Sequence, residues 1–164
     1  MRHSRSVSAM RFEFLVDRPA AIDSVSRWYF EEWGRLNSKA SVEEIAKKIS
    51  QSMNRDKPPL LLLAVEGSRV VGAAELKYRE MDIYPDREHW LGGLFVVPQY
   101  RGSGIGSKLI EKIALLAEEF GIRKLYLQTE RLDGGLYPDH GWEPLETVSY
   151  KGTEVLVMQK HVGA

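Results

Sequence analysis

Residues 91–120 read LGGLFVVPQYRGSGIGSKLIEKIALLAEEF and contain the clearest structural signals in the chain. Its continuous apolar run, Leu94 to Val97, is typical of a strand that is buried on both faces. Pro98 ends the strand, because proline cannot donate a hydrogen bond to a neighbouring strand. A glycine-rich turn follows over 99–106, and apolar residues then recur at the spacing of one helical face up to Phe120. The stretch therefore predicts a strand, a glycine loop and a helix in direct succession.

The junction between this loop and the helix is a predicted anion site. The first backbone N–H groups of a helix have no partner within the helix and lie at the positive end of its dipole. Glycines allow an anionic group to approach those N–H groups closely. Two common phosphate motifs are excluded, because the chain has no Gly-Lys-Ser or Gly-Lys-Thr and glycines 102, 104 and 106 do not fit G-x-G-x-x-G.

The loop resembles the acyl-CoA loop of the GNAT superfamily of N-acyltransferases. The signature of that family is [RQ]-x-x-G-x-[GA] between a buried strand and a helix, which Arg101, Gly104 and Gly106 match, and the flanking 96–100 and 107–109 also look like the family pattern. The resemblance implies acetyl-CoA as co-substrate, with its pyrophosphate on the amides of 101–106 and Arg101 near the phosphates. The candidate cofactor-binding residues are Phe95, Val96, Val97, Arg101, Gly102, Ser103, Gly104, Ile105 and Gly106.

Composition narrows the class of protein. A chain of 164 residues is near the usual size of one domain, and its net charge of +0 gives no reason to expect a nucleic-acid or anionic membrane partner. The absence of cysteine excludes disulfides, thiolate metal sites and a cysteine nucleophile, so a ping-pong mechanism through cysteine is excluded as well. Four scattered histidines without H-E-x-x-H spacing argue against a metal. Without an 18-residue apolar run or an apolar signal core, we expect a cytoplasmic protein.

The order of predicted elements indicates one domain over residues 11–164, preceded by a polar, basic segment, 1–10, that is either disordered or a start-site extension. Strands are predicted at 11–16, 60–65, 70–76, 89–97, 125–129, 142–150 and 154–159. One helix is predicted at 20–33, and a second begins at a capping box formed by Ser41 and Glu44 and has Met53 on its apolar face. A third helix runs from the glycine loop to Phe120. Gly72 suggests a bulge. The order resembles the GNAT fold, an α/β (α+β) fold. It implies a mixed, mostly antiparallel sheet with helices on both faces and a central parallel strand pair that splays apart.

Tyr137 is the candidate general acid. Residues 136–142 resemble the family segment [FL]-Y-x-x-x-G-[FW], in which the tyrosine protonates the leaving thiolate. A free tyrosine has a pKa of about 10 and so holds a proton near neutrality. The alternative is a tyrosine packed beside Trp142 with its hydroxyl at the surface. Pro138 and the glycines at 134 and 135 predict a short or irregular helix here.

The general base is less well specified. In the family it is often a carboxylate or histidine near the start of the strand before the loop, where Glu88 and His89 lie. Glu75 and His140 are weaker candidates, and each of these residues is otherwise a surface group. Some relatives have no dedicated base.

The resemblance implies an N-acetyltransferase that works by direct attack of a primary amine on acetyl-CoA. We expect a small-molecule amine as the acceptor; a protein N-terminal acetyltransferase and a non-catalytic acyl-CoA-binding module are the alternatives. The aromatic residues Trp28, Tyr29, Phe30 and Trp33 either pack in the core or line the acceptor site. Acidic residues Glu80, Asp82, Asp86 and Glu88 either attract a cationic amine or serve solubility. Many relatives form homodimers, for which 142–158 offers a shared edge.

Overall fold

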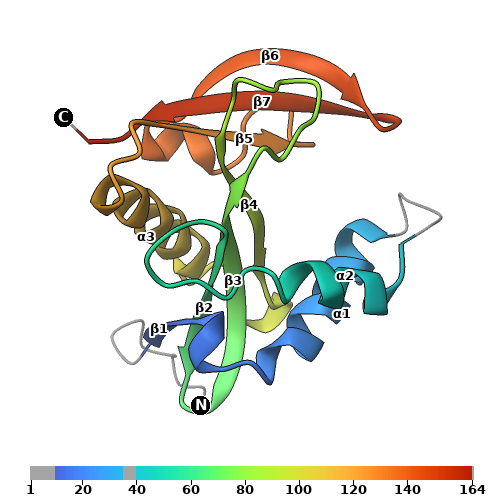
Figure 1. Ribbon diagram of the computed structural model, residues 1–164, viewed down its shortest axis with the longest axis vertical. Helices are drawn as coiled ribbons and strands as arrows, with labels where there is room; N and C mark the ends of the chain where they lie inside the picture. The colour runs from blue at the N-terminus through green and yellow to red at the C-terminus, as the bar shows by residue number, and fades with distance from the viewer. Residues whose placement is uncertain (1–9, 35–39, 164) are drawn as a thin grey trace.

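The structure, a computed structural model, describes residues 10–34 and 40–163, which form a seven-stranded sheet with helices on both faces (Figure 1). The strands are β1 (Met10–Phe14), β2 (Leu60–Glu66), β3 (Arg69–Tyr78), β4 (His89–Val96), β5 (Lys124–Thr129), β6 (Glu143–Tyr150) and β7 (Thr153–His161). The helices are α1 (Ala21–Trp33), α2 (Val42–Ile49) and α3 (Ile105–Glu119), with 3-10 turns η2 (Leu15–Asp17), η4 (Pro98–Tyr100) and η5 (Tyr137–His140).

The strand order in the sheet is β1-β2-β3-β4-β5-β7-β6. Every neighbouring pair is antiparallel except β4 and β5, which are parallel. The predicted element order and the predicted mixed, mostly antiparallel sheet are therefore confirmed. In Figure 1, β5, β7 and β6 cross above the upright strands β2, β3 and β4, so the sheet turns sharply at the parallel pair.

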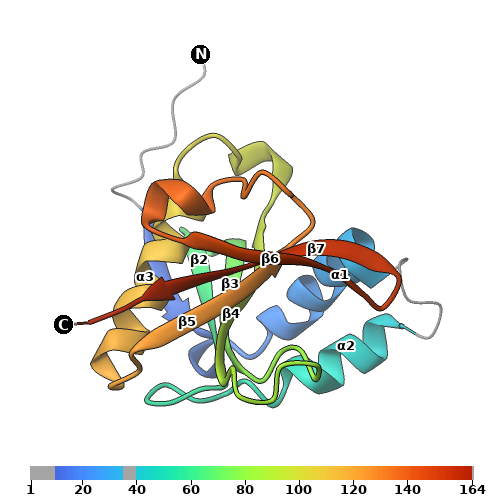
Figure 2. The same cartoon turned by 90° about the horizontal axis from the view of Figure 1, so that it is seen from above.

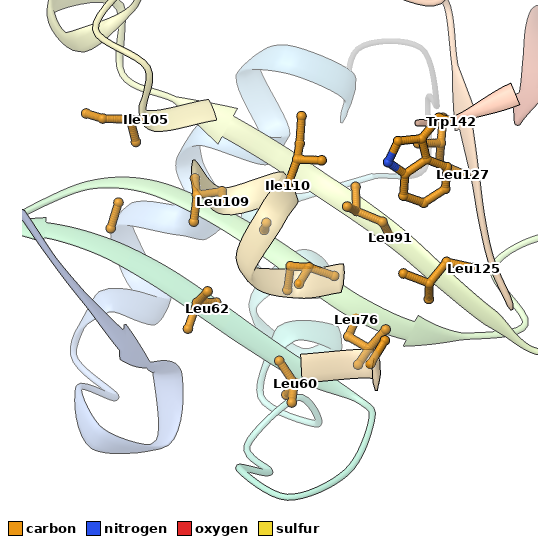
Figure 3. Close-up of a cluster of buried hydrophobic side chains, with 14 of the residues drawn as sticks. Leu60, Leu62, Leu76, Leu91, Ile105, Leu109, Ile110, Leu125, Leu127 and Trp142 are labelled. Atoms are coloured by element: carbon orange, nitrogen blue, oxygen red, sulfur yellow. The ribbon is translucent and has the colours of Figure 1, made fainter. Parts of the chain in front are cut away.

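The helices cover opposite faces of the sheet: Figure 2 shows α3 on one side of β2, β3 and β4, with α1 and α2 on the other. Strand β2 explains this arrangement, because alternate residues of a strand point to opposite faces. Leu60 and Leu62 belong to the core under α3 (Figure 3), whereas Leu61 and Leu63 pack with α1 and α2. A strand buried on both faces requires the unbroken apolar run that its sequence carries.

Several boundaries differ from the predictions, and the differences at β1 and α2 have local reasons. Met10 belongs to β1, where it pairs with Glu66, and residues 1–9 of the predicted extension lie outside the described residues. Strand β1 ends at Phe14 because the chain turns over the fully buried Leu15, whose carbonyl accepts from the N–H of Arg18 at 2.9 Å. Helix α2 ends at Ile49, so Met53 lies outside it and bridges to Leu60.

Two local predictions hold. The Ser41 hydroxyl accepts a hydrogen bond from the N–H of Glu44 at 3.1 Å and so caps α2. Ala64 pairs with Gly72 and Val65 with Val70, so β3 has one extra residue beside Gly72, which is the bulge that this glycine suggested. At the far edge of the sheet, β6 pairs with β7 alone among the described strands, and self-association along this edge stays a prediction. None of the helices in the described ranges has both the length and the apolar character needed to cross a membrane.

Candidate active site

The glycine loop leads into a helix start whose N–H groups no side chain caps. Gly104 is the N-cap of α3 in the left-handed conformation, with φ of 89°, and no side chain caps the helix there. The first helical hydrogen bond runs from Lys108 N–H to the Gly104 carbonyl at 3.0 Å. The amides of residues 105–107 therefore have no acceptor within the helix. A Cβ atom built on Gly104 would meet nothing within 4 Å, so there is open space beside the start of the helix, as an anion site requires.

Arg101 lies beside the end of β4 rather than over the helix. Its Nε donates to the Val96 carbonyl at 2.7 Å, and its guanidinium carbon is 5.2 Å from the Phe95 ring centroid. Three of the predicted cofactor-binding residues are thus in contact. The Ser103 hydroxyl donates to the Tyr100 carbonyl at 2.5 Å, and the Val97 N–H donates to the Val71 carbonyl at 2.9 Å. Val97 is therefore engaged in the sheet through its amide.

The parallel strands β4 and β5 separate toward the loop. Their register in the described chain consists of one pair, Trp90 with Tyr126. Beyond that pair, residues 92–96 of β4 are partly exposed although the strand lies in the middle of the sheet. The splayed pair that the family resemblance implied is therefore present, and its open end points to the start of α3.

A second bulge lies in the open part of β4. Ala73 pairs with Phe95 but Glu75 pairs with Gly92, so β4 carries one extra residue between them. Gly93 has a φ of 59°, and its carbonyl accepts a hydrogen bond from the Tyr29 hydroxyl at 2.6 Å. A Cβ atom on Gly93 would lie 2.4 Å from the Tyr29 hydroxyl and 2.6 Å from Glu75 Oε2, so only glycine fits.

Glu75 is a buried carboxyl beside this bulge, with 6% of the residue exposed. Burial raises its pKa most strongly, and the charge of Glu80 raises it further; Lys77, Lys48 and a hydrogen bond from Tyr29 lower it, and the net pKa is raised. The Ser52 hydroxyl lies 3.5 Å from Glu75 Oε1. A carboxyl with a raised pKa holds a proton more readily than an exposed one, which suits a general base.

Lys77 and Glu80 form an ion pair next to Glu75. Their Nζ–Oε1 distance is 2.5 Å, and Gln128 of β5 donates to the other Glu80 oxygen at 3.1 Å. Burial opposes the charge on both side chains, but their attraction outweighs it: the pKa of Lys77 is raised and that of Glu80 is lowered. The network crosses from β3 to β5, and the charge of Lys48 on α2 also acts on both Glu75 and Glu80.

Tyr137 lies at the first turn of η5, close to the start of α3. The predicted short helix is a 3-10 turn with Pro138 as its second residue. The Tyr137 ring meets Trp142 edge-on at 6.0 Å, and burial raises its pKa to about 12. His140 fixes η5 to α3, because its Nε2 is 3.0 Å from Ser107 Oγ and its Nδ1 is 3.5 Å from Glu111.

Glu88 and His89 lie at the opposite end of β4 from the glycine loop. His89 is its first residue and Val96 its last, which separates them by roughly 23 Å at 3.3 Å per residue. Glu88 pairs with Arg79 at 3.2 Å, and the His89 ring lies 5.0 Å from Tyr78. Burial lowers the pKa of His89. Both line a polar hollow of about 720 Å³, and the structure does not bring them together with Tyr137 or Arg101.

The first-helix aromatics divide between buried and exposed positions. Tyr29 is buried, Trp28 stacks on Phe95 with centroids 5.2 Å apart, and Trp33 is 36% exposed. The sequence interpretation did not foresee the Gly93 bulge or its contact with Tyr29. The signal was present in the paired glycines of Leu91-Gly92-Gly93, since glycine inside a strand often marks a bulge. Among the described residues, no group of three or more His, Cys, Asp or Glu side chains is placed to hold a metal ion.

Comparison with known proteins identifies relatives of this chain. The family model for the acetyltransferase (GNAT) family matches residues 22–135. A thialysine N-epsilon-acetyltransferase from Mus musculus is 40% identical over 62 residues, which are 38% of this chain and only 36% of the mouse protein. An uncharacterized N-acetyltransferase, YhfO, from Bacillus subtilis (strain 168) is 27% identical over 117 residues, 70% of this chain and 78% of that protein.

Solved structures share the fold at low identity. An aminoglycoside 6'-N-acetyltransferase complexed with coenzyme A superposes with a TM-score of 0.72 at 16% identity, covering 94% of this chain and 98% of that one. Ard1 from Thermoplasma volcanium gives a TM-score of 0.73 at 16% identity, covering 95% and 99% of the two chains. At this level of identity the likeness concerns the fold.

Proposed function

We propose, because this chain belongs to the acetyltransferase (GNAT) family, that it transfers an acetyl group from acetyl-CoA to a primary amine. The observation that carries the proposal is the splayed β4–β5 pair, whose open end meets the uncapped N–H groups of α3. An extended pantetheine arm fits between separated strands, because their backbone groups can pair with it as with an added strand. Its pyrophosphate then reaches the helix start, where Arg101 is the nearby cation.

In the proposed reaction, the amine nitrogen attacks the thioester carbonyl carbon. The carbon–sulfur bond breaks, and the products are an acetylated amine and coenzyme A. The amine must lose a proton and the leaving thiolate gains one. We propose that Tyr137 donates the proton that the thiolate gains. Burial raises the pKa of Tyr137 to about 12, so its hydroxyl is protonated at neutral pH.

For the base we favour Glu75 over Glu88 and His89. Glu75 lies against the Gly93 bulge in the open part of β4, whereas Glu88 and His89 lie at the far end of that strand. Glu75 accepts the amine proton directly or through one water molecule. The raised pKa of Glu75 supports this role, since a base works best when its pKa approaches the working pH.

A small cationic amine is the acceptor that we propose. The charges of Lys77 and Lys48 offset the burial of Glu75 only in part, because its pKa stays raised. A cationic amine beside Glu75 favours the ionised carboxylate, so the site favours a positively charged ligand. The thialysine and aminoglycoside acetyltransferases that this chain resembles are named for small amine substrates, and this supports a small amine as the acceptor.

The test is calorimetric titration of acetyl-CoA into the wild type and a Gly104→Glu variant, with Gly121→Glu as matched control. Both glycines have left-handed φ values, 89° and 80°, and open space around them, but they lie at opposite ends of α3. We expect binding to the wild type and to Gly121→Glu, and its loss in Gly104→Glu. Equal affinity in the two variants, or no heat at millimolar acetyl-CoA, contradicts the assigned site.

A thiol-release screen of free amines and short peptides then identifies the acceptor. Turnover with free amines supports the proposal. Turnover confined to peptides indicates a protein N-terminal acetyltransferase, and binding without any turnover indicates an acyl-CoA-binding module.

A further inference from the structure

Tyr29 reaches from α1 into the bulge of β4. Tyr29 is 7% exposed, and its ring packs in the core between α1, α2 and the sheet. The hydroxyl donates to the Gly93 carbonyl at 2.6 Å. A phenylalanine would fill the same apolar space, so packing alone does not account for the hydroxyl group.

The Gly93 carbonyl accepts the hydroxyl proton of Tyr29, and the Glu75 carboxyl lies beside the same hydroxyl. A Cβ atom on Gly93 would be 2.4 Å from Tyr29 Oη and 2.6 Å from Glu75 Oε2, so these two oxygens flank the same point of the bulge. Burial raises the pKa of Tyr29, and the charge and hydrogen bonding of Glu75 raise it further. The hydroxyl therefore remains a neutral donor.

Other groups also face Glu75 from each element around it. Ser52 follows α2, Lys48 lies on α2, and Lys77 and Glu80 lie on and after β3. The charge of Lys77 lowers the pKa of Glu75 and that of Glu80 raises it, so these two effects oppose each other. Of the groups around Glu75, the Tyr29 hydroxyl is the one that is hydrogen-bonded to the backbone of the β4 bulge.

We propose that Tyr29 is a positioning residue, whose hydroxyl fixes the β4 bulge through Gly93 and controls when Glu75 carries a proton. This inference rests on the proposed function, in which Glu75 takes a proton from the acceptor amine. While Glu75 is ionised, the Tyr29 hydroxyl stabilises the carboxylate; once Glu75 is protonated, the hydroxyl donates to the Gly93 carbonyl alone. The proton transfer is then completed without movement of the bulge.

The test compares Tyr29→Phe with the wild type, and Tyr150→Phe is the matched control. Tyr150 also loses a hydroxyl hydrogen bond, to Asp82 at 3.3 Å, at the hairpin between β6 and β7. For Tyr29→Phe we expect kcat to fall about tenfold at neutral pH, because the hydrogen bond that fixes the bulge beside Glu75 is lost. The Michaelis constant for acetyl-CoA should stay unchanged.

The pH dependence separates positioning from a merely structural role. Tyr29 lowers the pKa of Glu75, so its removal raises that pKa, and the rising acidic limb of kcat/KM moves to higher pH. A carbon-13 NMR titration of the Glu75 carboxyl should show the same upward shift without any turnover. Unchanged Glu75 titration in Tyr29→Phe overturns the inference, even if kcat falls. The proposed function fails separately, when the wild type releases no thiol with any amine.

Discussion

The two ends of the parallel pair β4–β5 are built differently. At the closed end, fully buried Trp90 pairs with Tyr126, with ring centroids 5.5 Å apart, and its Nε1 donates to the Arg87 carbonyl at 2.6 Å. At the open end, the Gly93 bulge and partly exposed residues 92–96 take the place of strand pairing. Aromatic packing thus holds two strands together at one end, so that backbone groups stay available for a ligand at the other.

The largest effect is expected at the closed end. Trp90→Ala should lower the free energy of unfolding by about 3–5 kcal/mol, because it removes a large buried ring and leaves a cavity. Urea denaturation measures this change. Trp33→Ala is the matched control, and its cost should be much smaller because Trp33 is 36% exposed. Equal costs would show that the closed end does not depend on Trp90.

The next effect tests which end of the strand pair holds the base. Glu75→Gln should lower kcat about 100-fold with acetyl-CoA affinity kept, since general base catalysis contributes at least this much. His89→Gln, at the closed end, should leave kcat nearly unchanged. Thiol release across pH is the measurement. The wild-type rate should rise as pH increases through the raised pKa of Glu75, and the Gln variant should lose this limb. A larger loss in His89→Gln would place the base at the closed end.

The same contrast explains how much of the molecule was predictable. The strand, glycine loop and α3 follow from local signals: an apolar run, a proline, glycines and helical spacing, all within residues 91–120. The capping box at Ser41 is equally local. Glycine inside a strand suggested a bulge at Gly72, and the structure has it.

The interior of the site depends instead on residues far apart in the chain. Tyr29 and Gly93 are 64 residues apart, and Glu75 meets them only because β3 pairs with β4 under α1. Neither local periodicity nor the family motif specifies such a contact. The preference for Glu88 and His89 came from their place in the sequence before the loop. Their distance from the loop along β4 and the burial of Glu75 are tertiary facts, and these shift our proposal to Glu75.

The smallest effect concerns the acid at the open end. Tyr137→Phe should lower kcat about tenfold, less than the loss of a base, because a thiol has a pKa of about 8.5 and its thiolate leaves without full protonation. The wild-type tyrosine delivers its proton at any pH well below its pKa of about 12. The variant depends on protons from solvent, so its defect should shrink as pH falls. Tyr126→Phe, on the paired strand at the closed end, should keep the wild-type rate across the same pH range. A defect in Tyr137→Phe that is constant with pH would mean that the ring positions the site through Trp142, with no part in proton delivery.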